Sequence, residues 1–189
     1  MELILIRHGE TEGNRERRFI GVTDEPLSPE GVRQAEAAGE RLPAAEHVYC
    51  SPLQRCRETA SLIWPNVPQT VIPQLRETDF GPFEGRNHRE LQDDPLYRRW
   101  LAGETTTGVE TAEDAADRAL EGFGCLLEDA ARQGFARVAV VSHGGTLMAI
   151  LGALGRPERD FYGWKCPNCG GFRAMLRTEP LFLEIVETV

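Results

Sequence analysis

The stretch Leu3-Ile4-Leu5-Ile6-Arg7-His8-Gly9 decides the fold class, because four branched aliphatic residues run directly into a cation, an imidazole and a glycine. A strand with one face in water alternates polar and apolar residues, so this unbroken apolar run predicts a strand that is buried on both faces. In open α/β sheets, ligands bind at the carboxyl ends of such strands. Arg7 and His8 are therefore candidate ligand-binding residues, with a polar loop after a core strand as the alternative.

Predicted strands and helices alternate along the rest of the chain, which indicates a largely parallel sheet covered on both faces. We expect further strands at residues 48–50, 70–72, 137–142, 172–176 and 181–185. The expected helices are 29–42 after the cap Ser28, 52–64 after the cap Ser51, a short helix after Asn87, a long helix from Thr111 to Gly134, and one between Gly145 and Gly155. Residues 14–25 lack periodicity and are predicted to form a loop.

The composition argues against several functional classes. With 189 residues, of which 41% are hydrophobic, the chain has enough material for the core of one domain. Its formal charge of −9 argues against nucleic-acid binding. No apolar run reaches the roughly 18 residues that span a bilayer. We therefore expect a soluble, cytoplasmic protein without a signal peptide, a nucleic-acid partner or a membrane partner, whose five cysteines are reduced thiols.

A second predicted strand meets a histidine in the same way. Val138-Ala139-Val140-Val141 is the clearest apolar run in the chain, and Ser142-His143-Gly144-Gly145 follows it directly. Arg55 falls in the first turn of the helix after the strand at 48–50. Because the carboxyl ends of parallel strands meet at one edge, we expect two histidines and two arginines to converge there. Separate donors of this kind suit a tetrahedral oxyanion, so phosphate is the expected ligand, and without a Walker sequence a nucleoside-triphosphate enzyme is not expected.

Five ordered motifs resemble those of the histidine phosphatase superfamily, which includes cofactor-dependent phosphoglycerate mutases. They extend over nearly the whole chain and are Arg7-His8-Gly9-Glu10-Thr11 with Asn14 and Gly21, Ser51-Pro52-Leu53-Gln54-Arg55, Leu75-Arg76-Glu77 with Glu84-Gly85, Gly108-Val109-Glu110-Thr111, and Ser142-His143-Gly144-Gly145. The resemblance implies a three-layer α/β/α sandwich with a mostly parallel central sheet, formed by a single domain over residues 1–189. It also implies a metal-independent phosphomonoesterase that needs no cofactor.

The resemblance implies a role for each motif residue. His8 would be the nucleophile that forms a phosphohistidine, while Arg7, Arg55 and His143 would hold the phosphoryl oxygens. Glu77 would protonate the leaving oxygen and later activate water. The implied substrate-binding residues are Arg7, Asn14, Gly21, Arg55 and Gly144. The residues alone leave open which of the two histidines attacks, and the resemblance selects His8.

Elementary electrostatics adds a prediction about ionisation. Arg7 and Arg55 disfavour protonation of His8, so the pKa of this histidine should lie below its usual value of ~6.5. Glu77 must start protonated, and activity should follow a bell-shaped pH profile. Asp79, two residues further along the same turn, competes with Glu77 for the role of acid.

Three functions fit these residues. The first is a phosphatase acting on a small phosphorylated metabolite, the second a phosphoglycerate mutase, and the third a catalytically silent phosphate-binding module. The interval between Glu77 and His143 is short for mutases of this family, which favours hydrolysis. The stretch at 75–85 is similar to that of alpha-ribazole phosphatases of cobalamin synthesis and of related broad-specificity phosphatases.

The leaving group is expected to contact residues 86–110, a predicted insertion that caps the substrate. The candidate residues there are Tyr97, Arg98, Arg99 and Trp100, with packing against the domain as their alternative role.

Cys166-Pro167-Asn168-Cys169 resembles half of a zinc site, but the remaining cysteines offer no second pair. Two reduced thiols in a turn are therefore favoured over a zinc site shared between subunits, and a homodimer is left open. Surface or capping roles are expected for His47, His88 and Glu84.

Overall fold

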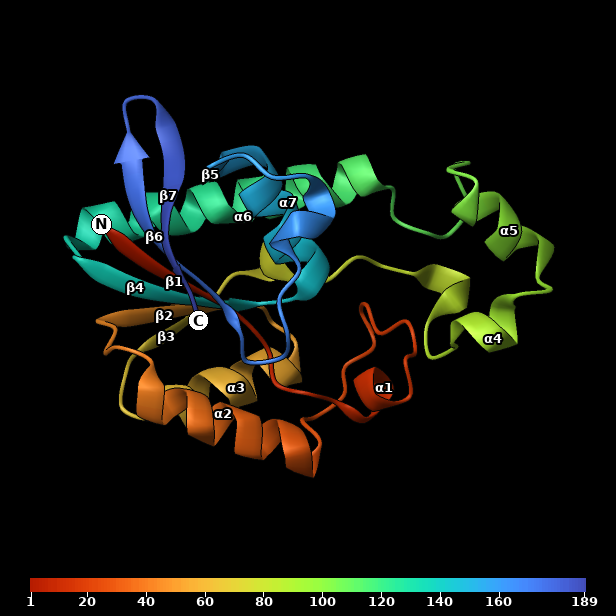
Figure 1. The fold of residues 1–189 in the computed structure, drawn as a ribbon, viewed down its shortest axis with the longest axis horizontal. Helices are drawn as coiled ribbons and strands as arrows, with labels where there is room; N and C mark the ends of the chain where they lie inside the picture. Colours follow the sequence, from red (N-terminus) through yellow and green to blue (C-terminus); the bar gives the residue numbers. More distant parts are fainter.

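A seven-stranded sheet runs through the centre of the computed structural model, which describes residues 1–189 (Figure 1). Its strand order is β3-β2-β4-β1-β6-β7-β5. The strands are β1 (Glu2–Arg7), β2 (His47–Cys50), β3 (Gln69–Val71), β4 (Arg137–Ser142), β5 (Gly155–Arg156), β6 (Gly171–Thr178) and β7 (Leu181–Thr188). Parallel pairs join β1, β2, β3 and β4, whereas β6 pairs antiparallel with β1 and β7. The sheet is mostly parallel, as predicted.

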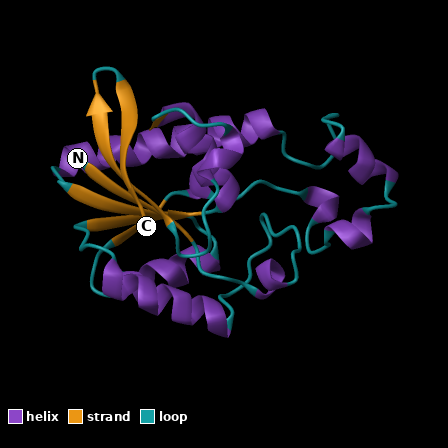
Figure 2. Ribbon diagram, viewed as in Figure 1, coloured by secondary structure: helices purple, strands orange, loops and turns teal.

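Helices cover both faces of this sheet (Figure 2). The helices α2 (Pro29–Arg41) and α3 (Gln54–Ile63) pack on one face, and α6 (Ala112–Gln133) and α7 (Gly144–Leu154) pack on the other. Side chains of β1 point alternately to the two faces of the sheet. Leu3 and Leu5 pack in the core under α6 and α7, whereas Ile4 and Ile6 pack in the core under α2 and α3. Burial on both faces explains the unbroken apolar run and confirms the three-layer α/β/α sandwich.

Most of the predicted caps are present. The Ser28 side chain accepts a hydrogen bond from Gly31 N at the start of α2, and Thr111 caps α6 in the same way. Gly134 ends α6 in the left-handed conformation, with φ 74°. Asn87 begins the short helix α4 (His88–Leu91) through a reciprocal capping box with Glu90.

One local prediction is wrong, and another is wrong at one end. The helix α3 begins at Gln54, and its N-cap Leu53 provides no side-chain hydrogen bond. The Ser51 hydroxyl accepts a hydrogen bond from Leu53 N, just before the helix, and also bonds to His143 at the sheet edge. The predicted loop at 14–25 overlaps the helix α1 (Glu12–Arg15), which a capping box at Thr11 stabilises. A helix of four residues held by its caps has no apolar periodicity that the sequence could reveal.

The chain between β3 and α6 extends beyond the carboxyl ends of β1 and β4 (Figure 1). It contains η1 (Pro73–Leu75), η2 (Gly81–Phe83), α4 and α5 (Pro95–Leu101), and a further short helix η3 (Phe161–Trp164) lies between β5 and β6. A small third core holds this region together, and its buried members are Phe83, Leu91, Tyr97 and Val109. No helix of the structure combines the length and the apolar character that crossing a membrane requires.

Candidate active site

Two histidines meet at the carboxyl edge of the sheet because β1 and β4 are adjacent and parallel. The register pairs Arg7 with Ser142, so His8 and His143 leave the two strands side by side. Their ring centroids lie 5.1 Å apart, and both side chains are buried. The predicted convergence of the two strand ends is confirmed.

The imidazole of His8 is held in one orientation by its own neighbour. His8 Nδ1 lies 2.7 Å from the carbonyl oxygen of Gly9. A carbonyl can only accept, so Nδ1 carries the proton and donates it. In the neutral ring, Nε2 then keeps a free lone pair. The orientation is the one that a nucleophilic histidine needs.

The pKa of His8 lies well below its ordinary value, as predicted. Burial is the largest cause because it penalises the charged form, and the positive charges of Arg55 and Arg7 act in the same direction. The hydrogen bond to Gly9 opposes them. His8 is therefore neutral near pH 7.

Arg55 and Arg7 bring positive charge to this edge without a carboxylate partner. The fully buried Arg55 donates to the carbonyl oxygens of Gly21 and Thr23 and to His143 Nδ1, at 2.7, 2.8 and 3.3 Å. Arg7 donates to the Cys166 carbonyl at 3.1 Å, and its buried Nε has no partner. Burying charge without a counter-ion is costly, so the two guanidiniums are suited to bind an anion.

His143 uses both ring nitrogens within the protein. Its Nδ1 accepts from Arg55 Nε, so Nε2 carries the proton in the neutral ring and donates to Ser51 Oγ at 2.7 Å. Burial, and then the charges of Arg55, His8 and Arg7, hold the pKa of His143 well below its usual value. A contact between His143 and a phosphoryl oxygen would replace the Ser51 bond, and this role stays a prediction.

The carboxylate of Glu77 lies at the N-terminus of α7, next to the histidine edge. Glu77 Oε2 accepts from Gly145 N and Oε1 from Thr78 N, both at 3.0 Å. A Cβ at position 145 would lie 2.5 Å from Glu77 Oε1, so the glycine permits this close approach. Asp79 is used differently, because its Oδ1 accepts from Gly81 N and fixes a turn.

A network of ion pairs and hydrogen bonds holds the segment that carries Glu77. Arg118 donates to the carbonyl oxygens of Gln74 and Arg76, both at 2.7 Å, and pairs with Glu110. Glu110 also pairs with Arg76. Burial alone would raise the pKa of Glu110, but hydrogen bonds from Arg118, from the backbone of Asp79 and from Arg76 lower it to about 2. This carboxylate is thus ionised at every ordinary pH and positions the Glu77 segment.

Asn14 and its partner Asn168 lie beside His8. Asn14 Oδ1 accepts from Thr11 N and from Asn168 Nδ2, at 3.3 and 3.1 Å. Asn168 Nδ2 also donates to the His8 carbonyl at 2.9 Å. These bonds fix the Asn14 side chain through its oxygen. They do not involve its amide nitrogen, Nδ2.

The two glycines predicted to bind substrate are placed differently. Gly144 lies beside Arg7, since a Cβ there would be 3.6 Å from Arg7 Nε. The N–H of Gly21 donates to the Glu84 carboxylate at 3.1 Å, and its carbonyl accepts from Arg55. Glu84 also binds the backbone N–H groups of Val22 and Thr23, so its predicted loop-capping role is confirmed. The roles of Gly21 and Gly144 toward substrate stay predictions.

The two cysteines of the turn at 166–169 support the site through their backbone. Cys166 provides the carbonyl that Arg7 binds, and Cys169 N donates to the Arg7 carbonyl at 3.0 Å. Their side chains pack into different cores, Cys166 with the α6 and α7 face and Cys169 with the α2 and α3 face. The arrangement favours a structural turn over a shared pair of metal ligands.

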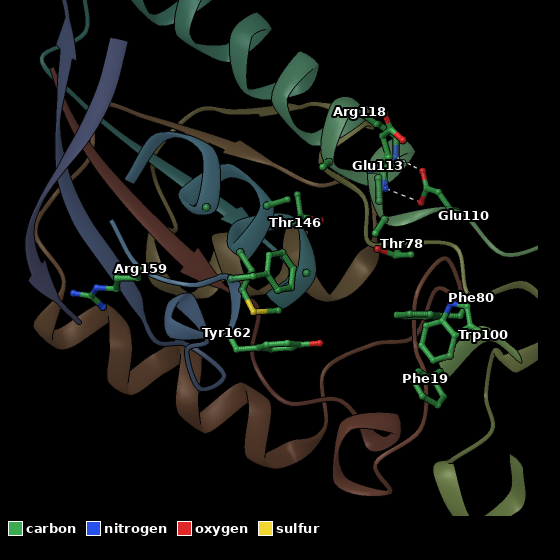
Figure 3. Close-up of a pocket in the computed structure, with 18 residues that line it drawn as sticks. Phe19, Thr78, Phe80, Trp100, Glu110, Glu113, Arg118, Thr146, Arg159 and Tyr162 are labelled. Carbon is green, nitrogen blue, oxygen red and sulfur yellow. Dashed lines mark hydrogen bonds and ion pairs between the residues drawn. The ribbon is translucent and has the colours of Figure 1, made fainter. Parts of the chain in front are cut away.

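A pocket of about 840 Å³ has Thr78 in its wall (Figure 3). Thr78 and Gly145, which both donate to Glu77, line it. The two histidines, Arg7 and Arg55 do not. The edge formed by these four residues, the predicted phosphate end, is therefore distinct from the pocket, and Thr78 and Gly145 connect the pocket to Glu77.

Only part of the predicted leaving-group segment lines this pocket. Trp100 and Glu110 do so, whereas Tyr97 is buried in the small third core. Arg98 and Arg99 are exposed and pair with Asp93 and Glu104. None of these three side chains lines the pocket, and for Tyr97 the structure shows the packing role that the sequence allows as the alternative.

Sequence reasoning missed the opposite side of the pocket. Met148, Phe161 and Tyr162 line it. In the sequence, the one indication of this side is the adjacent aromatic pair Phe161-Tyr162 in an otherwise polar connection. His47 and His88 lie outside the site, where they contact Thr70 and Tyr97, which is the surface role expected of them.

Residues 3–177 match the model of the histidine phosphatase superfamily, branch 1. The chain therefore belongs to this superfamily, and it is a phosphatase. It is 35% identical over 162 residues to an adenosylcobalamin/alpha-ribazole phosphatase of Salmonella typhimurium, an alignment that covers 82% of this chain and 79% of that protein. It is 33% identical to a probable phosphoglycerate mutase of Klebsiella pneumoniae, over 100% of this chain and 92% of the other.

A solved structure of a putative alpha-ribazole-5'-P phosphatase from Escherichia coli superimposes with a TM-score of 0.86. The two proteins are 28% identical, and the match covers 99% of this chain and 96% of that one. The similarity thus extends over the whole fold, including the phosphoglycerate mutase-like sheet.

Proposed function

We propose that this phosphatase hydrolyses a small phosphorylated metabolite through a phosphohistidine on His8. One observation carries the proposal: a neutral imidazole with a free Nε2 lies beside two guanidiniums, Arg7 and Arg55, that have no carboxylate partner. A dianionic phosphoryl group supplies the missing negative charge and presents phosphorus to the nucleophile. Its transition state spreads charge over the equatorial oxygens, which fixed cations stabilise.

In the first step, His8 Nε2 attacks phosphorus. The N–P bond forms while the P–O bond to the leaving group breaks, and the proton of Glu77 moves to the leaving oxygen. The alcohol departs toward the pocket that opens beside Glu77. The Nδ1–H bond to Gly9 stabilises the positive charge that develops on the imidazole.

In the second step, water attacks the phosphohistidine. Glu77, now a carboxylate, takes a proton from this water as the new P–O bond forms and the N–P bond breaks. Inorganic phosphate leaves, and both His8 and Glu77 return to their starting protonation states. The bonds that hold the Glu77 segment keep the same carboxyl group in place for both steps.

Two substrate classes deserve a direct test because relatives carry both names. Alpha-ribazole phosphate represents hydrolysis, and 3-phosphoglycerate represents a mutase. We favour hydrolysis, since the interval between Glu77 and His143 is short for mutases of this family. A cytoplasmic location, a homodimer and the capping role of residues 86–110 stay predictions from the sequence.

Phosphate release from a panel that includes both compounds tests the proposal. The wild-type protein should release phosphate, and the His8→Ala variant should not. Phosphoryl exchange between the two hydroxyls of phosphoglycerate without phosphate release would indicate the mutase. Binding of phosphate without turnover of any ester would indicate a silent binding module.

A further inference from the structure

The pocket beside Glu77 has two walls that come from distant parts of the chain. One wall consists of Phe19, Phe80 and Trp100. The ring centroid of Phe19 lies 5.2 Å from that of Phe80, with the two rings tilted. It lies 5.6 Å from that of Trp100, with the two rings edge to face. Figure 3 shows Tyr162 projecting from the opposite side toward this cluster. A pocket with aromatic rings in two facing walls suits a planar apolar group.

The second wall is unusual because its aromatic residues are exposed. Phe161 is 46% exposed and Tyr162 is 76% exposed, and their rings pack against each other at 5.3 Å. Large apolar surface left in water at the mouth of a concave site marks a binding surface. Between the walls, small residues of two helices form the floor, and they are Ala112, Ala115, Ala116, Gly145, Ala149 and Gly152.

The charges around the pocket exclude anionic leaving groups. The guanidinium of Arg118 donates its hydrogen bonds to Glu110 and to backbone carbonyls. The guanidinium of Arg159 stacks on Trp164 at 4.6 Å and points away from the pocket in Figure 3. Glu113 is exposed in the first turn of α6 and adds negative charge at the rim. A carboxylate bound here would meet Glu113 and find no free cation.

We propose that this pocket selects phosphomonoesters whose leaving alcohol carries an uncharged aromatic ring, with Tyr162 and Trp100 as the ring-binding residues and Glu113 as the residue that rejects carboxylates. The inference rests on the proposed function, because it makes the pocket the place of the leaving group. The junction at Thr78 and Gly145 fits this assignment, since both residues hold the carboxyl group that protonates the leaving oxygen. The preference runs against 3-phosphoglycerate, whose leaving part carries a carboxylate.

Three esters of primary alcohols separate ring binding from leaving-group reactivity. Benzyl phosphate carries the ring, ethyl phosphate lacks it, and 4-carboxybenzyl phosphate adds a negative charge to the same ring. We expect kcat/KM for benzyl phosphate to exceed that for ethyl phosphate by about 100-fold, the value of burying a ring in an apolar pocket. The 4-carboxybenzyl ester should fall about 10-fold or more below the benzyl ester. Equal values for the three esters would overturn the inference.

Matched variants assign the effect to the walls. Tyr162→Ala removes an exposed ring without opening a core, so it should lower kcat/KM for benzyl phosphate about 5- to 10-fold and leave ethyl phosphate unchanged. Glu113→Gln should raise kcat/KM for the carboxybenzyl ester several-fold relative to the benzyl ester. Val186→Ala, at an exposed position of β7, is the control that should change neither. Equal losses for benzyl and ethyl phosphate in Tyr162→Ala would contradict the assignment.

Binding of non-hydrolysable phosphonates keeps the two proposals distinguishable. Benzylphosphonate should bind more tightly than ethylphosphonate by calorimetry, and Tyr162→Ala should reduce this difference. If the protein releases phosphate from all esters without preference, the substrate class is wrong and the proposed function stands. If the phosphonates show the preference while no ester is hydrolysed, the proposed hydrolysis is wrong and the pocket assignment stands.

Discussion

The phosphate end and the leaving-group pocket of this protein are built by opposite strategies. The phosphate end lies where two adjacent strands end and α3 begins, and it combines two buried, neutral histidines with two arginines that donate to backbone carbonyls. The pocket uses side chains from separated loops and helices, and part of its aromatic surface lies in water. The phosphate end acts on the phosphoryl group that all substrates share. The pocket contacts the part of the substrate that differs, so its residues determine which substrate is preferred.

The largest loss of activity should result from substitution of His8, and it should be the same for every leaving group. His8→Ala removes the nucleophile, and kcat should fall by about 10⁴-fold or more for aromatic and aliphatic phosphates alike. Phosphate release measured with purified protein checks this. His88→Ala, at an exposed histidine outside the site, is the matched control and should keep full activity. An activity loss that depended on the leaving group would contradict the assignment of separate roles to the two regions.

Arg55→Lys keeps the charge at the phosphate end but loses the fork of donors. Lysine cannot bind the carbonyls of Gly21 and Thr23 together with His143, so we expect kcat/KM to fall about 10²- to 10³-fold. The loss should again be equal for benzyl and ethyl phosphate. Retention of wild-type kcat/KM in steady-state assays would show that the charge alone suffices.

Glu110→Gln tests the connection between the two regions. Glu110 lines the pocket and also pairs with the arginines that hold the Glu77 segment. Breaking these partly buried ion pairs should cost about 3 kcal/mol in urea unfolding, and kcat should fall about 10-fold as Glu77 loses its position. Glu104→Gln, which breaks the exposed pair with Arg99, should cost about 0.5 kcal/mol or less. A change in KM without a change in kcat would place Glu110 in leaving-group binding alone.

A further effect concerns the pH dependence of stability and arises at the phosphate end alone. The folded pKa of His8 and of His143 lies below the unfolded value of ~6.5, so the unfolded chain binds more protons between these values. Stability should therefore fall as the pH drops below about 6.5, by up to about 1.4 kcal/mol per pH unit for each histidine. Urea unfolding at pH 7.5, 6.0 and 5.0 measures this slope. It should be shallower in His8→Gln, and an unchanged slope would count against a neutral, buried His8.

The sequence predicts the phosphate end better than the pocket for a physical reason. Each strand runs straight into its functional residues, so the order of strands and helices alone brings His8 and His143 to one edge. No such rule connects Phe19 with Trp100 or Tyr162, because their meeting depends on how loops pack in three dimensions. The same limit hid the bond between Ser51 and His143, since a serine before a proline resembles a helix cap locally. The Glu110 motif was visible in the sequence, but its role as a support for Glu77 needed the structure.

Trapping the phosphoenzyme tests the central claim most directly. In Glu77→Gln, 4-nitrophenyl phosphate should still transfer its phosphoryl group, because this leaving group needs little protonation, whereas attack by water should be slow. We expect a burst of 4-nitrophenol close to one equivalent of enzyme, and mass spectrometry after an alkaline quench should locate one phosphoryl group on His8. A burst with the phosphoryl group on another residue such as His143, or turnover by the wild type with no phosphohistidine in either protein, would contradict the account.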